Sequence, residues 1–147
     1  MFMTCECVAS MFPIERSGII LKRKEKRSSG MEIERLHTND RMSQAVIHGN
    51  TVYLAGQVAQ NAPGAGAGEQ TRAILDQIDD LLAQAGTDKS KALTATIWLC
   101  DMDDFDEVNK VWDAWAGGGG APCRAAVQSP RLAAPQFTVE IGLIAAR

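Results

Sequence analysis

The chain has 147 residues, of which 46% are hydrophobic and 22% are charged, and its formal net charge is -3. This length and composition predict one globular domain. The acidic balance argues against a nucleic-acid-binding surface over the whole protein, which would need a basic surplus. No apolar run reaches the 18 or more residues of a membrane-spanning helix, so an integral membrane protein is excluded.

The first thirty residues differ in charge from the rest of the chain. Residues 1–30 carry six basic and three acidic side chains, whereas residues 31–147 carry nine basic and fifteen acidic ones. Because residues 1–30 show no sustained hydrophobic period, we expect a disordered extension before a domain over 31–147. A start codon placed too far upstream, a targeting segment or a nucleic-acid-binding arm would also give such a segment. The basic cluster follows rather than precedes the apolar residues, unlike a secretory signal, and the four cysteines lack a disulfide pattern, so we expect a cytoplasmic protein.

The first elements expected are two short strands over residues 43–59. Runs rich in Val, Ile and Tyr flank His-Gly-Asn at 48–50, and Gly and Asn tolerate the positive φ of a hairpin turn. Residues 61–68, with the sequence NAPGAGAG, indicate a loop. Over residues 69–85 the apolar positions are spaced by one, three and four, which predicts an amphipathic helix that stops at Gly86.

The second half of the chain predicts three strands and one helix. Residues 92–100 are apolar and β-branched, which favours a strand, and the acidic residues at 101–104 favour the start of a helix. That helix ends at the glycine run 117–120, and residues 124–128 and 137–146 follow as two strands. Its apolar side comprises Phe105, Val108, Val111, Trp112 and Trp115.

The order of these elements, β-β-α-β-α-β-β, predicts the α+β class. Each helix has one apolar stripe to bury, so both helices are expected on one face of the sheet. The strand at 92–100 has no charged side chain on either face, so the second sheet face needs a partner. We therefore expect a homo-oligomer.

Two residues, Arg124 and Glu140, are candidates for chemistry. Each has an ordinary interpretation, as an exposed arginine at a strand end and as a glutamate on the solvent face of a sheet. At a boundary between subunits, however, an arginine fork would suit a carboxylate, and a glutamate could orient and deprotonate a water molecule. The two histidines, His37 and His48, have no sequence-level reason to meet a nucleophile, and no zinc-site spacing or dinucleotide fingerprint is present.

Five segments resemble, in order and separation, the reactive intermediate deaminase family, also called the Rid or YjgF family. They are RMSQAVIHGNTVYLAGQVA (41–59), EQTRAILDQIDDLLAQAG (69–86), TATIWLCDMDDFDEVNKVW (94–112), APCRAAV (121–127) and VEIGLIAAR (139–147). The resemblance covers nearly all of residues 34–147. It implies a mixed β-sheet with two helices packed on one face, assembled as a homotrimer whose sheets form a central barrel, with active clefts between subunits.

The resemblance also implies roles for individual residues. Arg124 matches the arginine of the family's P-x-R motif, which binds the substrate carboxylate, and Glu140 matches the glutamate of the E-I-x-x-I-A pattern, which positions the attacking water. The substrate-binding residues implied are Arg124, Gly56, Ala126, Asn109 and Met42. Two positions depart from the family pattern and reshape the pocket, because Met42 stands where an aromatic residue is common and Ala55 replaces the serine of S-G-Q.

The function implied is hydrolysis of reactive enamines and imines, such as 2-aminoacrylate and 2-iminopropanoate, to 2-oxo acids and ammonia. Such a 2-iminobutanoate/2-iminopropanoate deaminase-like hydrolase needs no metal and no organic cofactor. Its expected partners are a small imino or oxo acid and further copies of itself, with no nucleic acid and no membrane. Two alternatives stay open: a trimer that binds small carboxylates or acts as a chaperone without chemistry, and a deaminase or hydrolase of a larger imine-like metabolite.

Overall fold

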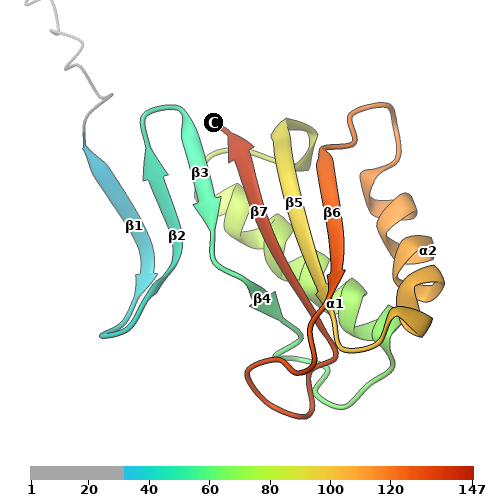
Figure 1. The fold of residues 1–147 in the computed structure, drawn as a ribbon. Helices are drawn as coiled ribbons and strands as arrows, with labels where there is room; N and C mark the ends of the chain where they lie inside the picture. The colour runs from blue at the N-terminus through green and yellow to red at the C-terminus, as the bar shows by residue number, and fades with distance from the viewer. Residues whose placement is uncertain (1–31) are drawn as a thin grey trace, which may run out of the picture.

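One mixed β-sheet with two α-helices on one face forms the fold of residues 32–147, the part of the chain that this computed structural model describes (Figure 1). The strands are β1 (Ile33–Thr38), β2 (Ser43–His48), β3 (Thr51–Leu54), β4 (Gln57–Val58), β5 (Ala92–Leu99), β6 (Cys123–Gln128) and β7 (Val139–Ala146). The α-helices are α1 (Ala67–Gln84) and α2 (Phe105–Ala116), and the short 3-10 helices are η1 (Lys89–Lys91) and η2 (Met102–Asp104). The extension predicted over 1–30 lies outside the described residues.

The sheet has the strand order β1-β2-β3-β7-β5-β6, and β4 pairs with β7 beyond the end of β3. All pairs are antiparallel except β5 and β6, which run parallel. Parallel neighbours need a long crossover connection, and α2 supplies it. The α+β class, the single sheet and the placement of both helices on one face agree with the sequence-based expectation.

Two strands were not predicted from the sequence. Strand β1 forms an edge of the sheet, and only Leu36 in it is partly buried, so its residues lack the alternation that marks a half-buried strand. Strand β4 has two residues and is separated from β3 by Ala55 and Gly56. Two boundaries also shift by two residues, because α1 begins at Ala67 rather than 69, and β7 begins at Val139 rather than 137.

The hydrophobic core lies between the sheet and the two helices. The predicted stripe of α1 is buried there, and α2 contributes Val108, Trp112 and Trp115. Alternate residues of β7 close the core from the sheet side: Val139, Ile141, Leu143 and Ala145. Each large apolar side chain in such a layer contributes about 1.5–3 kcal/mol on burial, so this layer fixes which way β7 faces.

The opposite face of the sheet is covered by no helix within residues 32–147 (Figure 1). The intervening residues of β7, including Glu140 and Gly142, point to this open face. Gly142 leaves room for the ring of Trp98, because a Cβ there would lie 3.3 Å from the Trp98 Cζ3 atom. Tyr53 on β3 is 45% exposed on the same face. An apolar, uncovered sheet face is thus present, as predicted.

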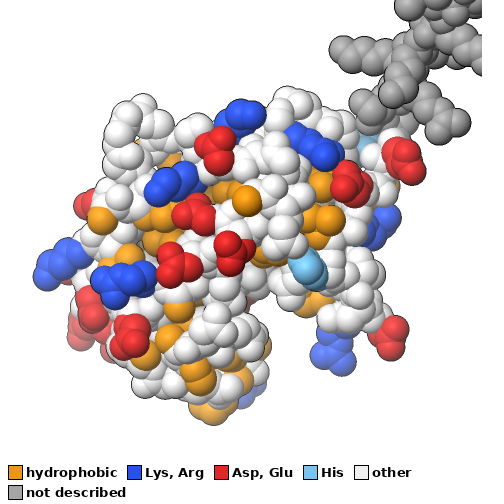
Figure 2. All heavy atoms as spheres, turned by 180° about the vertical axis from the view of Figure 1, so that it is seen from behind, with side chains coloured by type: hydrophobic (Ala, Val, Ile, Leu, Met, Phe, Trp, Pro, Cys, Tyr) orange, Lys and Arg blue, Asp and Glu red, His pale blue; other side chains and the backbone are white. Residues whose placement is uncertain are grey.

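The helix side presents a different surface. Figure 2 shows acidic and basic side chains spread over it, with hydrophobic side chains visible between them. Within the described part of the chain, no helix is long and apolar enough to cross a membrane.

Candidate functional site

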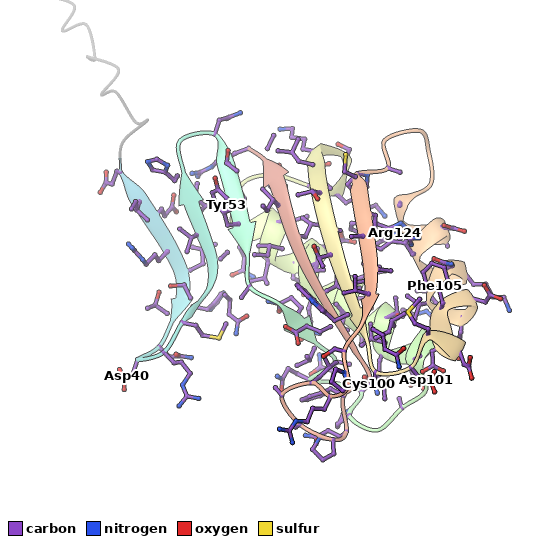
Figure 3. All side chains as sticks on the ribbon, in the orientation of Figure 1. Asp40, Tyr53, Cys100, Asp101, Phe105 and Arg124 are labelled. Atoms are coloured by element: carbon purple, nitrogen blue, oxygen red, sulfur yellow. The ribbon has the colours of Figure 1, made fainter. Side chains whose placement is uncertain are left out.

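Arg124 lies near the start of β6 and is held against helix α2. Its Nη1 donates a 2.9 Å hydrogen bond to Oδ1 of Asn109. Its guanidinium carbon lies 5.3 Å from the centre of the Trp112 ring and 5.7 Å from that of Phe105, which are cation–π distances (Figure 3). The guanidinium carries five N–H donors, so most of them stay available to a carboxylate.

The sequence creates this arrangement through a helical spacing and a strand register. Phe105, Asn109 and Trp112 are four and three residues apart, so they share one face of α2. The parallel register pairs Arg124 with Ala95, which is buried beneath the helices, so Arg124 points to the helix side of the sheet. Sequence reasoning assigned Asn109 to the site but placed Phe105 and Trp112 only in the helix core. Their spacing of four and three residues from Asn109 was the signal that both rings also contact the Arg124 guanidinium.

Ala126 follows Arg124 by two residues and therefore faces the same side of β6. Its partner in the register is Ile97, a buried residue, and its side chain packs partly against the core. Arg124, Asn109 and Ala126 thus lie together between β6 and α2. A substrate contact at Ala126 stays a prediction.

Glu140 lies on the open face of β7, directly above Gly56. Leu54, Ala55 and Gly56 stand opposite only two residues of β7, 142 and 143, so the chain forms a β-bulge where β3 gives way to β4. A Cβ at Gly56 would overlap the Glu140 side chain, lying 2.9 Å from its Cδ atom. Glycine at position 56 therefore allows the Glu140 carboxylate to lie against the backbone.

The bulge also opens a cleft beside Glu140. The Ala55 N–H still donates to the Gln44 carbonyl oxygen of β2. Beyond Ala55 the chain pairs with β7 as β4, so β2 and β4 separate (Figure 1). The cleft has a volume of about 520 Å³ and reaches from Glu140 and Gly56 to helix α1. Met42, at the entrance to β2, lines it as well. The structure thus brings together Glu140, Gly56 and Met42, three of the predicted site residues.

Burial raises the pKa of the Glu140 carboxyl group. The cause is desolvation, which disfavours the charged form. A carboxylate with a raised pKa is a stronger proton acceptor than an exposed one, and this property suits a general base near neutral pH.

The predicted residues therefore form two groups within one chain. Arg124 lies on the helix side of the sheet, whereas Glu140 pairs with Trp98 on the open face, and strand β5 lies between their strands. Within one chain the two side chains therefore point to opposite sides of the sheet. A site that used both side chains would take Arg124 from one copy and Glu140 from another.

Metal ligands are not gathered in this part of the protein. Among residues 32–147, no group of three or more His, Cys, Asp or Glu side chains is arranged to hold a metal ion.

Comparison with known proteins identifies the family. Residues 32–147 match the family model described as Endoribonuclease L-PSP. The RutC family protein YoaB of Escherichia coli is 47% identical over 116 residues, which cover 79% of this chain and 99% of that protein. The chain belongs to the YjgF/Rid family.

A solved structure and a more distant relative extend this result. A YjgF family member from Neisseria meningitidis has a TM-score of 0.76 and 44% sequence identity, covering 80% of this chain and 97% of that one. A rat protein named 2-iminobutanoate/2-iminopropanoate deaminase is 33% identical over 96 residues, which cover 61% of this chain and 69% of that protein.

Proposed function

We propose that this protein hydrolyses reactive imines of 2-amino acids, of the 2-aminoacrylate and 2-iminopropanoate type, to 2-oxo acids and ammonia. The observation that carries the proposal is the prearranged Arg124, whose guanidinium is fixed by one amide and two aromatic rings. A guanidinium fork binds a carboxylate through two parallel hydrogen bonds. The name of the rat relative supports the same chemistry.

The reaction requires the protein to position the substrate and one water molecule and to transfer protons between them. Arg124 binds the substrate carboxylate and so fixes the C=N carbon in place. Glu140 of another copy removes a proton from a water molecule as its oxygen attacks that carbon. Glu140 delivers this proton to the nitrogen and then passes the remaining hydroxyl proton to it as well. The C–N bond breaks as the C=O group forms, and ammonia leaves with both protons of the water. Water and imine thus become 2-oxo acid and ammonia, with no net oxidation and no cofactor in the scheme.

The assembly belongs to the same proposal. We place the site between the subunits of a homotrimer whose open sheet faces form a central barrel, because the two groups of site residues lie on opposite faces of one chain. A cytoplasmic location also stays a prediction.

Replacement of Arg124 by alanine tests the proposal. An amino-acid oxidase generates the imine in the assay, and ammonia release and loss of imine are followed. We expect Arg124→Ala to lower kcat/KM by about 100-fold or more, because both charged hydrogen bonds to the carboxylate are lost. The matched control is Arg35→Ala, an exposed arginine on edge strand β1, which should keep wild-type activity.

Two results would contradict the proposal. Wild-type rates in Arg124→Ala would remove this side chain from the mechanism. If the wild-type protein binds a 2-oxo acid through Arg124 but accelerates no imine hydrolysis, the protein is a carboxylate-binding module instead.

A further inference from the structure

A hydrogen bond between the two helices fixes a second tryptophan beside the one that contacts Arg124. Trp115, one turn after Trp112 on α2, directs its indole N–H at Asp79 on α1. Its Nε1 lies 3.1 Å from both Oδ1 and Oδ2 of Asp79, so the two oxygens share the single N–H of the ring. Trp115 is 9% exposed, and a buried indole N–H needs such an acceptor. Asp79 therefore fixes the direction of the Trp115 ring.

Trp115 in turn packs against Trp112. The two ring centres are 5.2 Å apart and the ring planes are inclined by 48°, which is in the range of favourable aromatic pairs. On Trp115 the Lys89 ammonium group also lies 5.5 Å from the ring centre, at a cation–π distance. Both tryptophans are buried in a close-packed layer, so a turn of the Trp115 ring would displace Trp112.

Trp112 extends this series of contacts to the guanidinium of Arg124. The guanidinium carbon lies 5.3 Å from the centre of the Trp112 ring, while Asn109 accepts its 2.9 Å hydrogen bond. Arg124 itself is an exposed residue near the start of β6, so its direction depends on these neighbours on α2. A continuous series of side-chain contacts thus runs from Asp79 on α1, through Trp115 and Trp112 on α2, to Arg124.

We propose that Asp79 is a positioning residue for Arg124. By holding Trp115, it keeps Trp112 in the place where that ring supports the guanidinium. The proposal rests on the imine hydrolysis proposed above, in which this guanidinium binds the substrate carboxylate. A bidentate pair needs both N–H donors of the fork directed at the carboxylate, so a shift of the supporting ring weakens binding. Asp79 itself takes no part in the chemistry.

Asp79→Ala tests the proposal through binding of the carboxylate. We expect KM for the alanine-derived imine, formed by an amino-acid oxidase in the assay, to rise about fivefold while kcat changes less than about twofold, because Arg124 holds the carboxylate in the ground state and the transition state alike. The Kd of 2-oxobutanoate, measured by calorimetry without turnover, should rise by the same factor. Lower stability alone would change neither constant at temperatures where the variant is folded.

Two further variants separate the hydrogen bond from the packing. Asp79→Asn keeps an Oδ1 acceptor for the Trp115 N–H, so KM and Kd should return to within about twofold of the wild-type values. Trp115→Phe removes the donor but keeps a ring beside Trp112. It should raise both constants as Asp79→Ala does, and combining the two substitutions should add nothing further. The matched control Asp76→Ala removes an exposed carboxylate one turn earlier on α1 and should keep the wild-type constants.

The outcomes separate this proposal from the proposed function. If the wild type binds 2-oxobutanoate but hydrolyses no imine, the proposed function is wrong, and the Kd values alone decide on Asp79. If Asp79→Ala keeps the wild-type KM and Kd, or Asp76→Ala raises them equally, Asp79 is not a positioning residue. If Asp79→Asn raises both constants as much as alanine does, the hydrogen bond to Trp115 is not the cause.

Two remaining results also decide. If Asp79→Ala does not fold, Trp115→Phe removes the same hydrogen bond from the other helix, and wild-type constants in that variant would overturn the proposal. If the wild type neither binds 2-oxobutanoate nor hydrolyses an imine faster than water does, this proposal and the proposed function both fail.

Discussion

Arg124 and Glu140 are both ionisable, but their surroundings differ. Those of Arg124 attract its positive charge, whereas those of Glu140 disfavour its negative charge. Arg124 lies against two aromatic rings and an amide oxygen, which attract its guanidinium and fix its direction. Glu140 is partly buried in a cleft, and desolvation raises its pKa. One side chain is thereby suited to holding an anion and the other to accepting a proton.

The raised pKa of Glu140 predicts the pH dependence of activity. Only the ionised carboxylate can take a proton from water, so kcat/KM should fall on acidification with a midpoint above the ordinary glutamate range. In Glu140→Gln this acidic limb should disappear together with most of the turnover, while binding of a 2-oxo acid is weakened less. Equal losses of turnover and binding would indicate a structural role.

The same pKa shift has a consequence for stability. The folded state binds the proton of Glu140 more tightly than the unfolded state, so stability falls as the pH rises from the unfolded to the folded pKa. Above both values the buried charge destabilises the protein. Glu140→Gln should therefore be more stable than the wild type at neutral pH, and the difference should vanish below the ordinary carboxyl range. Thermal unfolding of both proteins across this pH range measures the effect.

At the scale of elements, one buried glutamine connects α1 to the loop that leads into β7. Gln70 Nε2 donates to the carbonyl oxygens of Ala65 and Gln136, at 2.8 and 3.1 Å, and its Oε1 accepts a 3.0 Å hydrogen bond from the Thr138 N–H. Glu140 follows Thr138 by two residues. The position of the proposed base in the cleft thus depends on a helix that is distant in sequence.

Replacement of Gln70 by alanine should destabilise the fold strongly. The variant loses three hydrogen bonds to the backbone that are made by a fully buried side chain, which we expect to cost about 3 kcal/mol and to lower Tm by roughly 10 °C. The control Arg72→Ala changes an exposed residue of the same helix and should stay within about 0.5 kcal/mol of the wild type. Denaturant unfolding of both variants gives the comparison, and an unchanged Gln70→Ala would show that water replaces these bonds.

At the scale of the whole molecule, the open sheet face and the divided site lead to the same expectation. Trp98 and Tyr53 are partly exposed on that face, and Arg124 and Glu140 point away from each other across the sheet. A cyclic arrangement of identical copies would cover the face and repeat each shared site around the axis. We therefore expect three chains per particle in light-scattering measurements.

Mixed oligomers test whether the site is shared between copies. We expect co-expressed Arg124→Ala and Glu140→Gln chains to regain activity that neither variant has alone. With equal amounts, about one quarter of the sites would combine an intact Arg124 from one copy with an intact Glu140 from the next, by the product of two independent halves. If both residues acted from the same copy, no mixed particle would contain an intact site.

Much of the fold follows from local patterns along the chain. In the helices the apolar residues recur every three or four positions, and the buried strands are apolar and rich in β-branched residues. Each pattern favours one type of secondary structure, so α1, α2, β5 and β7 were predictable. Strands β1 and β4 were not, because an exposed edge strand and a two-residue strand carry too little buried surface to impose a pattern. The bulge at Gly56 was also hidden, since it depends on how β3 and β7 align.

The sequence by itself determined the family resemblance, because this depends on residue types and their order. For the same reason it was enough to select the candidate site residues Arg124, Glu140, Gly56 and Asn109. Only the tertiary structure decided that Arg124 and Glu140 face opposite sides of the sheet. It also decided that Phe105 and Trp112 hold the guanidinium and that Asp79 holds Trp115. These relations depend on strand register and on contacts between residues far apart in the chain, and local spacing does not specify either.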